Sequence, residues 1–313
     1  MAKIVTVFRG TSGVNNKLDP TRISIDFKTG ICALAEGVNI NIDDTGRIDR
    51  CRGFTATSIT DAMHSLFDCG SYALGVSGDA LQVINPNYSV SSIRNVTENA
   101  RMRYVKFNDV IFYLNGYEKG YVQNKVSYAW TRSTYTGPTT DRTYSDPPIG
   151  YILEIYKGRM LIAVRKSNAY FIKFSEAGYL GRFDMALNGM PFQSHIRMVR
   201  SVQNGFYVST DDAIYWISGP ISIWEGGLQF PPIMQVADYP SVEGTDLIVP
   251  GSRIGDGIPG EIAIWTAGQG KGICIGTMDG RFQNLTEGEL TYPDAHYGTA
   301  LYKDGKYIVS LQA

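Results

Sequence analysis

Apolar and polar residues alternate in short runs along most of this chain. In six places two such runs flank a turn that carries Gly, Asn or Asp. Alternation of period two with a turn signal between the runs is typical of a β-hairpin. The six predicted hairpins span residues 65–76, 102–114, 152–164, 196–209, 247–265 and 300–309.

The turns recur at nearly regular intervals. Marked by Gly70, Asn108, Gly158, Gly205, Gly260 and Gly305, they lie 38, 50, 47, 55 and 45 residues apart by subtraction. A period of roughly 40 to 50 residues with about four strands per unit is that of β-propeller blades. Residues 169–174, 213–217 and 272–276 supply further strands for the third, fourth and fifth units.

The sixth unit is short of strands, because only eight residues follow Gly305. The N-terminal part of the chain offers a spare hairpin, in which residues 38–42 and 47–51 alternate around a turn at 43–46. Pairing of this hairpin with the C-terminal strands would protect both chain ends from having an open edge. We therefore predict an all-β fold, a six-bladed β-propeller whose last blade is completed by residues from about 35 to 55. The predicted domains are an extended N-terminal arm, 1–34, and a single propeller domain, 35–313.

Composition and charge agree with one globular body. The chain has 43% apolar and 19% charged residues with 34 Gly and 20 Tyr, which suits many short strands and tight turns. No run of about 18 apolar residues is present, so we expect no membrane span. The first residues lack the pattern of a secretion signal. The 29 basic and 30 acidic side chains disfavour tight general binding to nucleic acid.

Candidate chemistry is sparse. Cys32, Cys51, Cys69 and Cys274 are too scattered for a zinc motif, and we expect reduced, mostly buried thiols. His64, His195 and His296 each precede a predicted first strand, which suggests one common rim. No further His or Cys stands at ligand spacing beside them, so we expect no metal and no cofactor.

A glycosidase would need a pair of acidic residues with their carboxyl groups about 5 to 9 Å apart. Most of the candidates lie at or beside predicted turns, where Asp is favoured because its side chain bonds to the local backbone. A Gly-x-Ser-x-Gly nucleophile motif and a phosphate-binding loop are also absent from the sequence. We therefore expect no catalytic residues and no enzyme activity. The carboxylates considered are Asp68, Asp109, Glu154, Asp211 and Asp212.

Two stretches depart from the strand pattern. Residues 1–30 resemble an arm with turns and little core of its own, which needs its own propeller or a neighbouring subunit to lie on. Residues 131–148 are rich in Thr, Tyr, Asp and Pro and predict a long exposed loop. Long loops without structure often bind something, so contact of this loop with a partner is a hypothesis.

The N-terminal residues also carry a family resemblance. The order Phe8-Arg9-Gly10, Gly13-Val14-Asn15-Asn16, Pro20-Thr21-Arg22-Ile23 and then residues 35–53 resembles the opening of propeller proteins from bacteriophage tails. The matching residues of the last segment are Asn39, Asp43, Thr45, Gly46, Arg50 and Gly53. The resemblance covers about the first 55 residues and is only architectural beyond them.

This resemblance implies a nozzle or tail-hub protein of a short-tailed phage. Such a protein is made in the host cytoplasm and resides in the virion tail. The implied partners are further copies of the chain, in a homo-oligomer of six, together with portal or adaptor and fibre or other tail proteins. DNA is implied only as cargo of the channel, without sequence-specific binding. The sequence lacks the large inserted domains of longer family members, which argues against a gating role more than against a ring role.

Within the N-terminal hairpin, Val38, Ile40 and Ile42 are predicted to face the blade, while Asn39, Asn41 and Asp43 share the other face. Ring closure or subunit contact is therefore assigned to five residues, Asn39, Asp43, Gly46, Arg47 and Arg50. Arm contacts are assigned to Asn15 and Arg22.

The favoured function is that of a non-enzymatic virion component, a rigid disc that presents loops and an arm to its neighbours. The alternative is a carbohydrate-binding or glycan-cleaving propeller that recognises a cell surface, since aromatic faces stack on sugars. For this alternative Trp130 and Trp224 are the expected exposed platforms, while Trp216 and Trp265 lie within apolar strands and are expected in the core.

Overall fold

The computed structural model describes residues 10–26, 28–29, 31–43, 45–51, 56–134, 142–224, 227–229, 231–254 and 258–312. Within these ranges the regular structure consists of β-strands and two short 3-10 turns, η1 (Pro20–Arg22) and η2 (Gly251–Arg253). The prediction of an all-β fold is confirmed.

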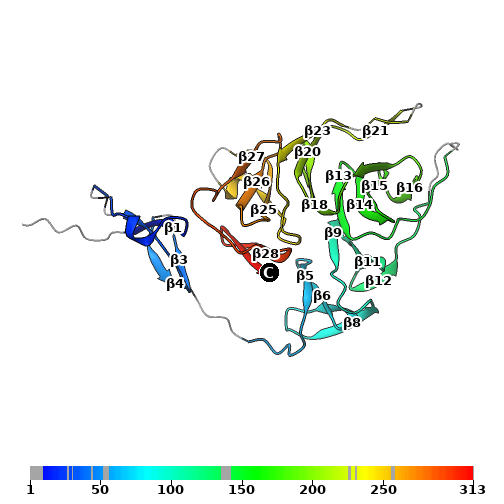
Figure 1. Ribbon diagram of the computed structural model, residues 1–313. Coiled ribbons are helices and arrows are strands. Elements are labelled where there is room, and N and C mark those ends of the chain that lie inside the picture. The colour runs from blue at the N-terminus through cyan, green and yellow to red at the C-terminus, as the bar shows by residue number, and fades with distance from the viewer. Residues whose placement is uncertain are drawn as a thin grey trace, which may run out of the picture.

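Most strands form antiparallel sheets that follow one another along the chain and radiate from a common centre, as in a β-propeller (Figure 1). We call these sheets blades. The first blade contains β5 (His64–Asp68), β6 (Ala73–Ser77), β7 (Ala80–Ile84) and β8 (Val90–Asn95). The second contains β9 (Arg103–Phe107), β10 (Val110–Leu114), β11 (Lys119–Gln123) and β12 (Val126–Ala129).

The third blade has five strands: β13 (Ile152–Tyr156), β14 (Arg159–Lys166), β15 (Ala169–Glu176), β16 (Tyr179–Phe183) and β17 (Gly189–Phe192). The fourth contains β18 (Ile196–Val202), β19 (Gly205–Thr210), β20 (Ile214–Ser218) and β23 (Ile233–Ala237). Between β20 and β23 the chain forms a small hairpin, β21 (Ser222–Trp224) and β22 (Gly227–Gln229). The fifth blade contains β24 (Leu247–Pro250), β25 (Glu261–Ala267), β26 (Gly272–Gly276) and β27 (Phe282–Asn284).

The chain ends in a two-stranded sheet, the C-terminal hairpin, made of β28 (Tyr297–Lys303) and β29 (Lys306–Gln312). All six predicted hairpins are therefore present, as β5–β6, β9–β10, β13–β14, β18–β19, β24–β25 and β28–β29. Five of the six marker residues have the positive φ that favours Gly or Asn in such turns, and Gly205 is the exception. Asn108, Gly158 and Gly305, for example, all have positive φ.

In the part of the chain that the structure describes, buried apolar side chains form five clusters, and each cluster joins one blade to the next. Leu74 of the first blade packs with Tyr113 of the second, and Phe174 of the third packs with Phe206 of the fourth. In the last cluster Ile264 of the fifth blade meets the partly buried Tyr302 and Tyr307 of the C-terminal hairpin. No such cluster among the described residues joins the C-terminal hairpin to the first blade.

The tryptophans only partly follow the prediction. Trp216 and Trp265 are buried as expected, with 4% and 0% of their surface exposed. Trp130 was predicted as an exposed platform, and this is wrong, because its ring lies between Phe112 and Phe183 and is only 4% exposed. Trp224 lies in β21, where side chains are outside the described part of the structure.

The N-terminal residues form a small unit of their own, which we call the N-terminal module (residues 10–51). Strands β1 (Gly10–Val14) and β2 (Ile31–Leu34) pair in parallel, and β3 (Ile40–Ile42) pairs with β4 (Ile48–Arg50) as a hairpin. The backbone N–H of Thr11 donates to the carbonyl oxygen of Gly46 at 2.8 Å, which connects the two pairs. The predicted arm thus carries two strands and η1, and its contacts continue past the predicted boundary at residues 34 and 35.

Closure of the last blade by the N-terminal hairpin is not found within the chain. β3 and β4 pair only with each other, as do β28 and β29, and no ladder among the described residues joins the two hairpins. The physical reason lies in the anchoring of the module. The Asn16 N–H donates to the Glu289 oxygen, and the Asn16 side chain bonds to the backbone of Thr291 at both its amide atoms. These bonds hold the module beside the segment between β27 and β28, away from the edge of β29 (Figure 1).

The two ends of the predicted 131–148 loop are tied to the third blade. The Gly181 N–H donates to the Ser133 hydroxyl oxygen at 2.9 Å, and Ser145 forms a bridge with Phe183. The Arg182 guanidinium lies over the Tyr144 ring at 3.7 Å. Residues 135–141 are outside the described residues, so contact of the loop tip with a partner stays a prediction.

Candidate functional site

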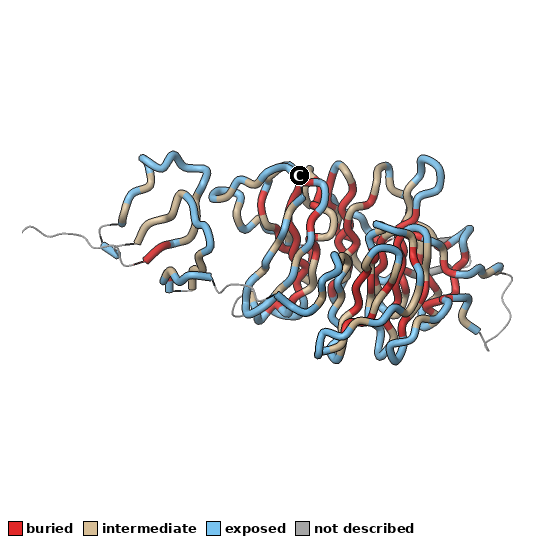
Figure 2. Tube along the Cα trace, turned by 90° about the horizontal axis from the view of Figure 1, so that it is seen from below, coloured by how far each residue is buried: buried red, intermediate tan, exposed pale blue. Residues whose placement is uncertain are grey.

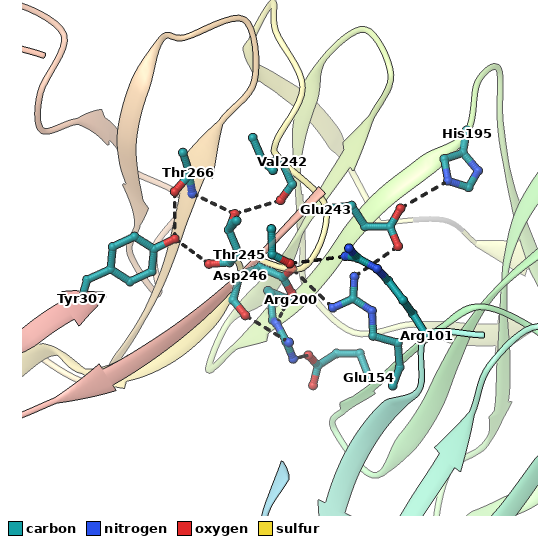
Figure 3. Close-up of polar contacts among 12 residues, drawn as sticks. Arg101, Glu154, His195, Arg200, Val242, Glu243, Thr245, Asp246, Thr266 and Tyr307 are labelled. Atoms are coloured by element: carbon teal, nitrogen blue, oxygen red, sulfur yellow. Dashed lines mark hydrogen bonds and ion pairs between the residues drawn. The ribbon is translucent and has the colours of Figure 1, made fainter. Parts of the chain in front are cut away.

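The centre of the propeller holds a network of charged side chains from four consecutive blades (Figure 3). The Arg200 guanidinium on β18 lies 2.9 Å from a Glu154 carboxylate oxygen on β13 and 2.5 Å from an Asp246 oxygen just before β24. Arg103 on β9 reaches Glu243 at 3.3 Å and Asp246 at 3.8 Å. Each ion pair thus connects innermost strands, or the residues just before them, from different blades.

Burial and pairing set the charges of this network. Burial raises the pKa of Asp246, but Arg200 and Arg103 outweigh it and hold that pKa below its ordinary value. Burial also raises the pKa of Glu154, and here Arg200 offsets only part of the effect, so that the pKa of Glu154 stays above its ordinary value. Burial lowers the pKa of Arg200, but its two carboxylate partners raise it above the usual range, so Arg200 stays charged.

A pocket of about 410 Å³ lies next to this network. It is lined by His195, Arg197, Glu243, His296, Tyr297 and Gln312. Glu243 is the carboxylate of the lining, and it sits between Arg103 and the His195 Nε2 atom, which is 3.8 Å away. Burial raises the pKa of Glu243, but His195 and Arg103 together bring it below its ordinary value. Glu243 is therefore ionised at neutral pH and serves as a hydrogen-bond acceptor rather than as a general acid.

The cationic and aromatic groups of the pocket are held in place by neighbours. Arg197 pairs with Asp211 at 2.6 Å, and the His195 ring stacks on Tyr151 with 4.7 Å between ring centres. Such supported side chains, with donors and an acceptor facing one cavity, are suited to orienting a small polar ligand.

Arg101 connects the second blade to the C-terminal hairpin at this same place. Its guanidinium lies 4.6 Å from the centre of the Tyr297 ring. It also donates to the carbonyl oxygen of Gly298 at 3.4 Å and to the Gln312 side chain at 3.2 Å. The hairpin is fixed on its other side by the Tyr307 hydroxyl, which donates to the Thr245 carbonyl oxygen at 2.6 Å. Polar contacts thus hold β28 and β29 where the apolar cluster to the first blade is missing.

The histidines and carboxylates considered from the sequence are distributed as follows. His195 and His296 line the same pocket, as the common rim suggested, whereas His64 lies in β5 beside Ser65. Among the residues that the structure describes, no group of three or more His, Cys, Asp or Glu side chains is placed to hold a metal ion.

Of the candidate carboxylates, Asp68 accepts from the Gly70 N–H in its own turn, and Asp212 accepts from the Ser194 hydroxyl. Asp211 and Glu154 are ion-paired as described above, and only Glu154 belongs to the central network. The four cysteines are free, Cys69 and Cys274 being buried, Cys32 half-buried and Cys51 exposed.

The residues assigned to ring closure lie in the N-terminal module and act mainly within it. The Asp43 carboxylate accepts from the Thr45 and Arg47 N–H groups, each at 2.9 Å, which stabilises the hairpin turn. Arg47 pairs with Asp49 at the surface. Gly46 has a φ of 80° and lies against Thr11, while Asn39 has a φ of 59° just before β3. Arg50, the fifth of these residues, pairs in register with Ile40.

The two arm residues differ in role. The Asn15 side chain accepts from the Lys17 and Leu18 N–H groups and so stabilises the turn at this point. The next residue, Asn16, bonds to Thr291 of the propeller. Arg22 lies in η1. Contact of any of these seven residues with another subunit stays a prediction.

Several residues of the central site were missed from the sequence. Arg101, Arg103, Arg200, Glu243 and Asp246 stand at or just before the first strand of their blades. A usable signal existed, because each of these charges begins or interrupts a run that should be apolar if it faced only neighbouring blades. Arg103 and Arg200 both stand five residues before their turn markers, Asn108 and Gly205, so a comparison of the six units could have found this pair of residues.

The structure contains no helix, among the residues described, that is long and apolar enough to cross a membrane.

Comparison with known proteins gives a fold likeness and no family. No protein-family model matches the chain, and no curated protein matches it by sequence. Among solved structures it is similar to an auxiliary nutrient binding protein from Bacteroides thetaiotaomicron, with 11% identity, 78% of this chain and 65% of that chain covered, and a TM-score of 0.45. It is also similar to the N-terminal domain of Nup159, with 10% identity, coverage of 84% and 76%, and a TM-score of 0.43. A third similar structure is Hsv2 of Kluyveromyces lactis, with 7% identity, coverage of 85% and 75%, and a TM-score of 0.37. At these identities and scores the likeness carries no argument about function.

Proposed function

We propose that this chain is a structural protein of a bacteriophage tail, a subunit of a homo-oligomeric ring of the nozzle or hub type. The ring continues the DNA channel and anchors neighbouring tail proteins or fibres. The proposal rests on the resemblance of the first 55 residues to such proteins and on the way these residues are built.

The observation that carries the proposal is the weak core of the N-terminal module. Only Gly10, Thr11 and Gly46 are buried among its described residues, while Leu18 and Val38 are 42% and 72% exposed. Figure 2 shows the contrast between this module and the buried sheets of the propeller. A unit of this size with so small a core is not stable alone, so it needs a surface to bind. A neighbouring subunit in a ring supplies such a surface by a heterologous contact.

The propeller supplies the rigid body that a ring needs. Five apolar clusters connect its blades in sequence, and the ion pairs of Arg200 and Arg103 connect the innermost strands. Close packing of this kind resists deformation when neighbouring proteins exert force on the subunit. In the assembled ring the C-terminal hairpin forms the inner half of a sixth blade. The function is non-enzymatic, and it requires neither a metal nor a cofactor.

Native mass spectrometry of the purified full-length chain tests this proposal. We expect a closed oligomer, six copies under the family resemblance, whose rings are visible by electron microscopy. Val38→Asp places a charge on the exposed module and should shift the population to monomers. The matched control is Tyr88→Asp, since Tyr88 is 52% exposed on the first blade, away from the module. If the wild-type chain stays monomeric at every concentration and salt tested, the ring proposal is wrong.

A second candidate function is sugar binding at a cell surface, and the pocket beside Glu243 favours it. The pocket combines hydrogen-bond donors, an ionised acceptor and the Tyr297 ring, which is the combination that sugar sites use. A glycan array separates the two functions. Selective binding that is lost in Glu243→Gln and Tyr297→Ala, but kept in Tyr88→Ala, would favour the sugar site. Absence of binding to any glycan would leave the structural function as the better account.

A further inference from the structure

The C-terminal hairpin is half of a blade with one open edge. The other blades have four or five strands, whereas β29 pairs only with β28. The turn between them is a two-residue turn with positive φ at Asp304 and Gly305, and Lys303 lies opposite Lys306. In such a hairpin the pair next to the turn is hydrogen-bonded and the pattern then alternates. The N–H and C=O groups of Tyr307, Val309 and Leu311 therefore point away from β28, where the structure shows no ladder partner for them.

The face of this hairpin toward the first blade is also uncovered. Tyr297, Leu301 and Ile308 are 45%, 48% and 49% exposed, and Leu66 on β5 is 65% exposed. An open edge beside exposed apolar side chains is the arrangement that accepts an added strand.

The N-terminal module contains the complementary piece. The β3–β4 hairpin is a free two-stranded sheet, which is the number of strands that the C-terminal hairpin lacks to equal a four-stranded blade. Its Ile40, Ile42 and Ile48 share one face and are only half-buried. Within one chain the Lys306 ammonium group already donates to the Asn41 side chain.

The hairpin of the same chain is held off the open edge. Asn16 and Lys17 bind the backbone of residues 287–291, outside β28 and β29. In the same chain the tip of the C-terminal hairpin contacts β3 through Lys306 and Asn41, and the module lies outside the ring of blades (Figure 1).

We propose that the β3–β4 hairpin of one copy adds to the β29 edge of a second copy and completes its sixth blade. This inference rests on the proposed homo-oligomer and names the contact that builds it. Each subunit then gives one hairpin and receives one, which is a heterologous contact repeated around a ring.

A proline on the receiving edge tests the contact. Val309→Pro removes an outward N–H without breaking a β28–β29 hydrogen bond, since proline is tolerated on edge strands. Val309→Thr keeps the N–H and is the matched control. We expect native mass spectrometry to show mainly monomers for Val309→Pro and wild-type oligomers for Val309→Thr. Both variants are also compared at a dilution at which each is monomeric. Equal thermal unfolding midpoints there establish that the proline has not unfolded the hairpin.

Photocrosslinking in a mixture of ¹⁴N- and ¹⁵N-labelled full-length chains identifies the donor copy. A benzophenone-maleimide is attached to the exposed native Cys51 at the end of β4, in a Cys32→Ser background. We expect links from Cys51 to residues 306–312, with half of them joining unlike isotopes once the subunits have exchanged.

The outcomes separate this inference from the ring proposal. Oligomers that persist in Val309→Pro, or crosslinks only between like isotopes, overturn the exchange of hairpins while leaving the ring in place. A monomeric wild-type chain overturns both.

Discussion

The β18–β19 hairpin and the β28–β29 hairpin have similar apolar patterns and different surroundings. Every described residue of β19 is buried, whereas β29 alternates between exposed and half-buried residues. The first hairpin has a blade packed on each face and a third strand on its edge, while the second has a blade on one face only. The sequence of a strand therefore specifies that it is a strand, and its neighbours decide how much stability each side chain supplies.

The largest expected effect is a core truncation in the fourth blade compared with one in the C-terminal hairpin. Phe206 is fully buried between the third and fourth blades, so Phe206→Ala should lower the free energy of unfolding by about 3–5 kcal/mol. Ile308→Ala on the exposed face should change it by about 0.5 kcal/mol or less in the monomer. Urea unfolding followed by tryptophan fluorescence measures both. Equal losses would contradict the comparison.

Next in size is the loss of a central carboxylate. Asp246→Asn removes the buried carboxylate that the half-buried Arg200 and Arg103 share, and we expect a loss of about 3 kcal/mol, since a broken buried pair costs roughly 3–5 kcal/mol and Glu154 still pairs with Arg200. The control is Asp279→Asn, which breaks an exposed pair with Arg281 and should cost about 0.5 kcal/mol. If the central network did not stabilise the fold, the two variants would lose the same small amount of free energy of unfolding.

An effect of intermediate size is expected from adding a side chain at Gly46, and it should destabilise the N-terminal module alone. A Cβ on Gly46 would lie 2.4 Å from the Thr11 carbonyl oxygen, and φ is 80°. Gly46→Ala should therefore open the bond from the Thr11 N–H and raise the hydrogen exchange rate of that amide, at a cost of about 1–3 kcal/mol. Gly13→Ala shares the positive φ and meets no atom within 4 Å, so it should cost about 1 kcal/mol. The urea midpoint of the propeller should move in neither variant.

The smallest expected effect is a pH dependence at the gap between the first blade and the C-terminal hairpin. Burial, together with the nearby Arg101 charge, lowers the pKa of His64. The unfolded chain then binds a proton at His64 more readily than the folded chain does. The resulting stability is full above the unfolded pKa of about 6.5 and is lost as pH falls through the folded pKa. The urea midpoint should therefore fall less between pH 7 and 5 in His64→Gln than in the wild type. The same fall of the midpoint in both proteins would contradict this.

The strands and turns could be predicted from the sequence because the signals for them are local. Asn108, Gly158 and Gly305 mark turns through backbone conformations that few residues adopt, and alternation marks the strands on either side. The burial of Trp130 could not be predicted in this way, because it depends on Phe183 of another blade, more than 50 residues away.

The same limit applies to the central site and to the ends of the chain. Arg200, Glu154 and Asp246 meet only once three blades have been placed, so their pairing has no signature in the local sequence. The shortage of strands in the last unit could be predicted from the eight residues after Gly305, and β28 and β29 do form a sheet of only two strands, whereas the predicted pairing of this sheet with the N-terminal hairpin of the same chain is not found. A count of strands does not show where the N-terminal hairpin lies, because the bonds of Asn16 to Thr291 that hold it have no signature in the sequence pattern.

Among the residues that the structure describes, five clusters join consecutive blades and none joins the C-terminal hairpin to the first blade, which has a consequence for the order in which the monomer unfolds. Blades in the middle of the series are covered on both faces, so the amides of β14, β19 and β25 should exchange with solvent only on global unfolding. Fraying should start on either side of the uncovered gap, at β5 and at β29, and advance inward one blade at a time. A single copy should therefore unfold locally from the first blade and from the C-terminal hairpin. Any contact that joins these two elements would slow local unfolding at both.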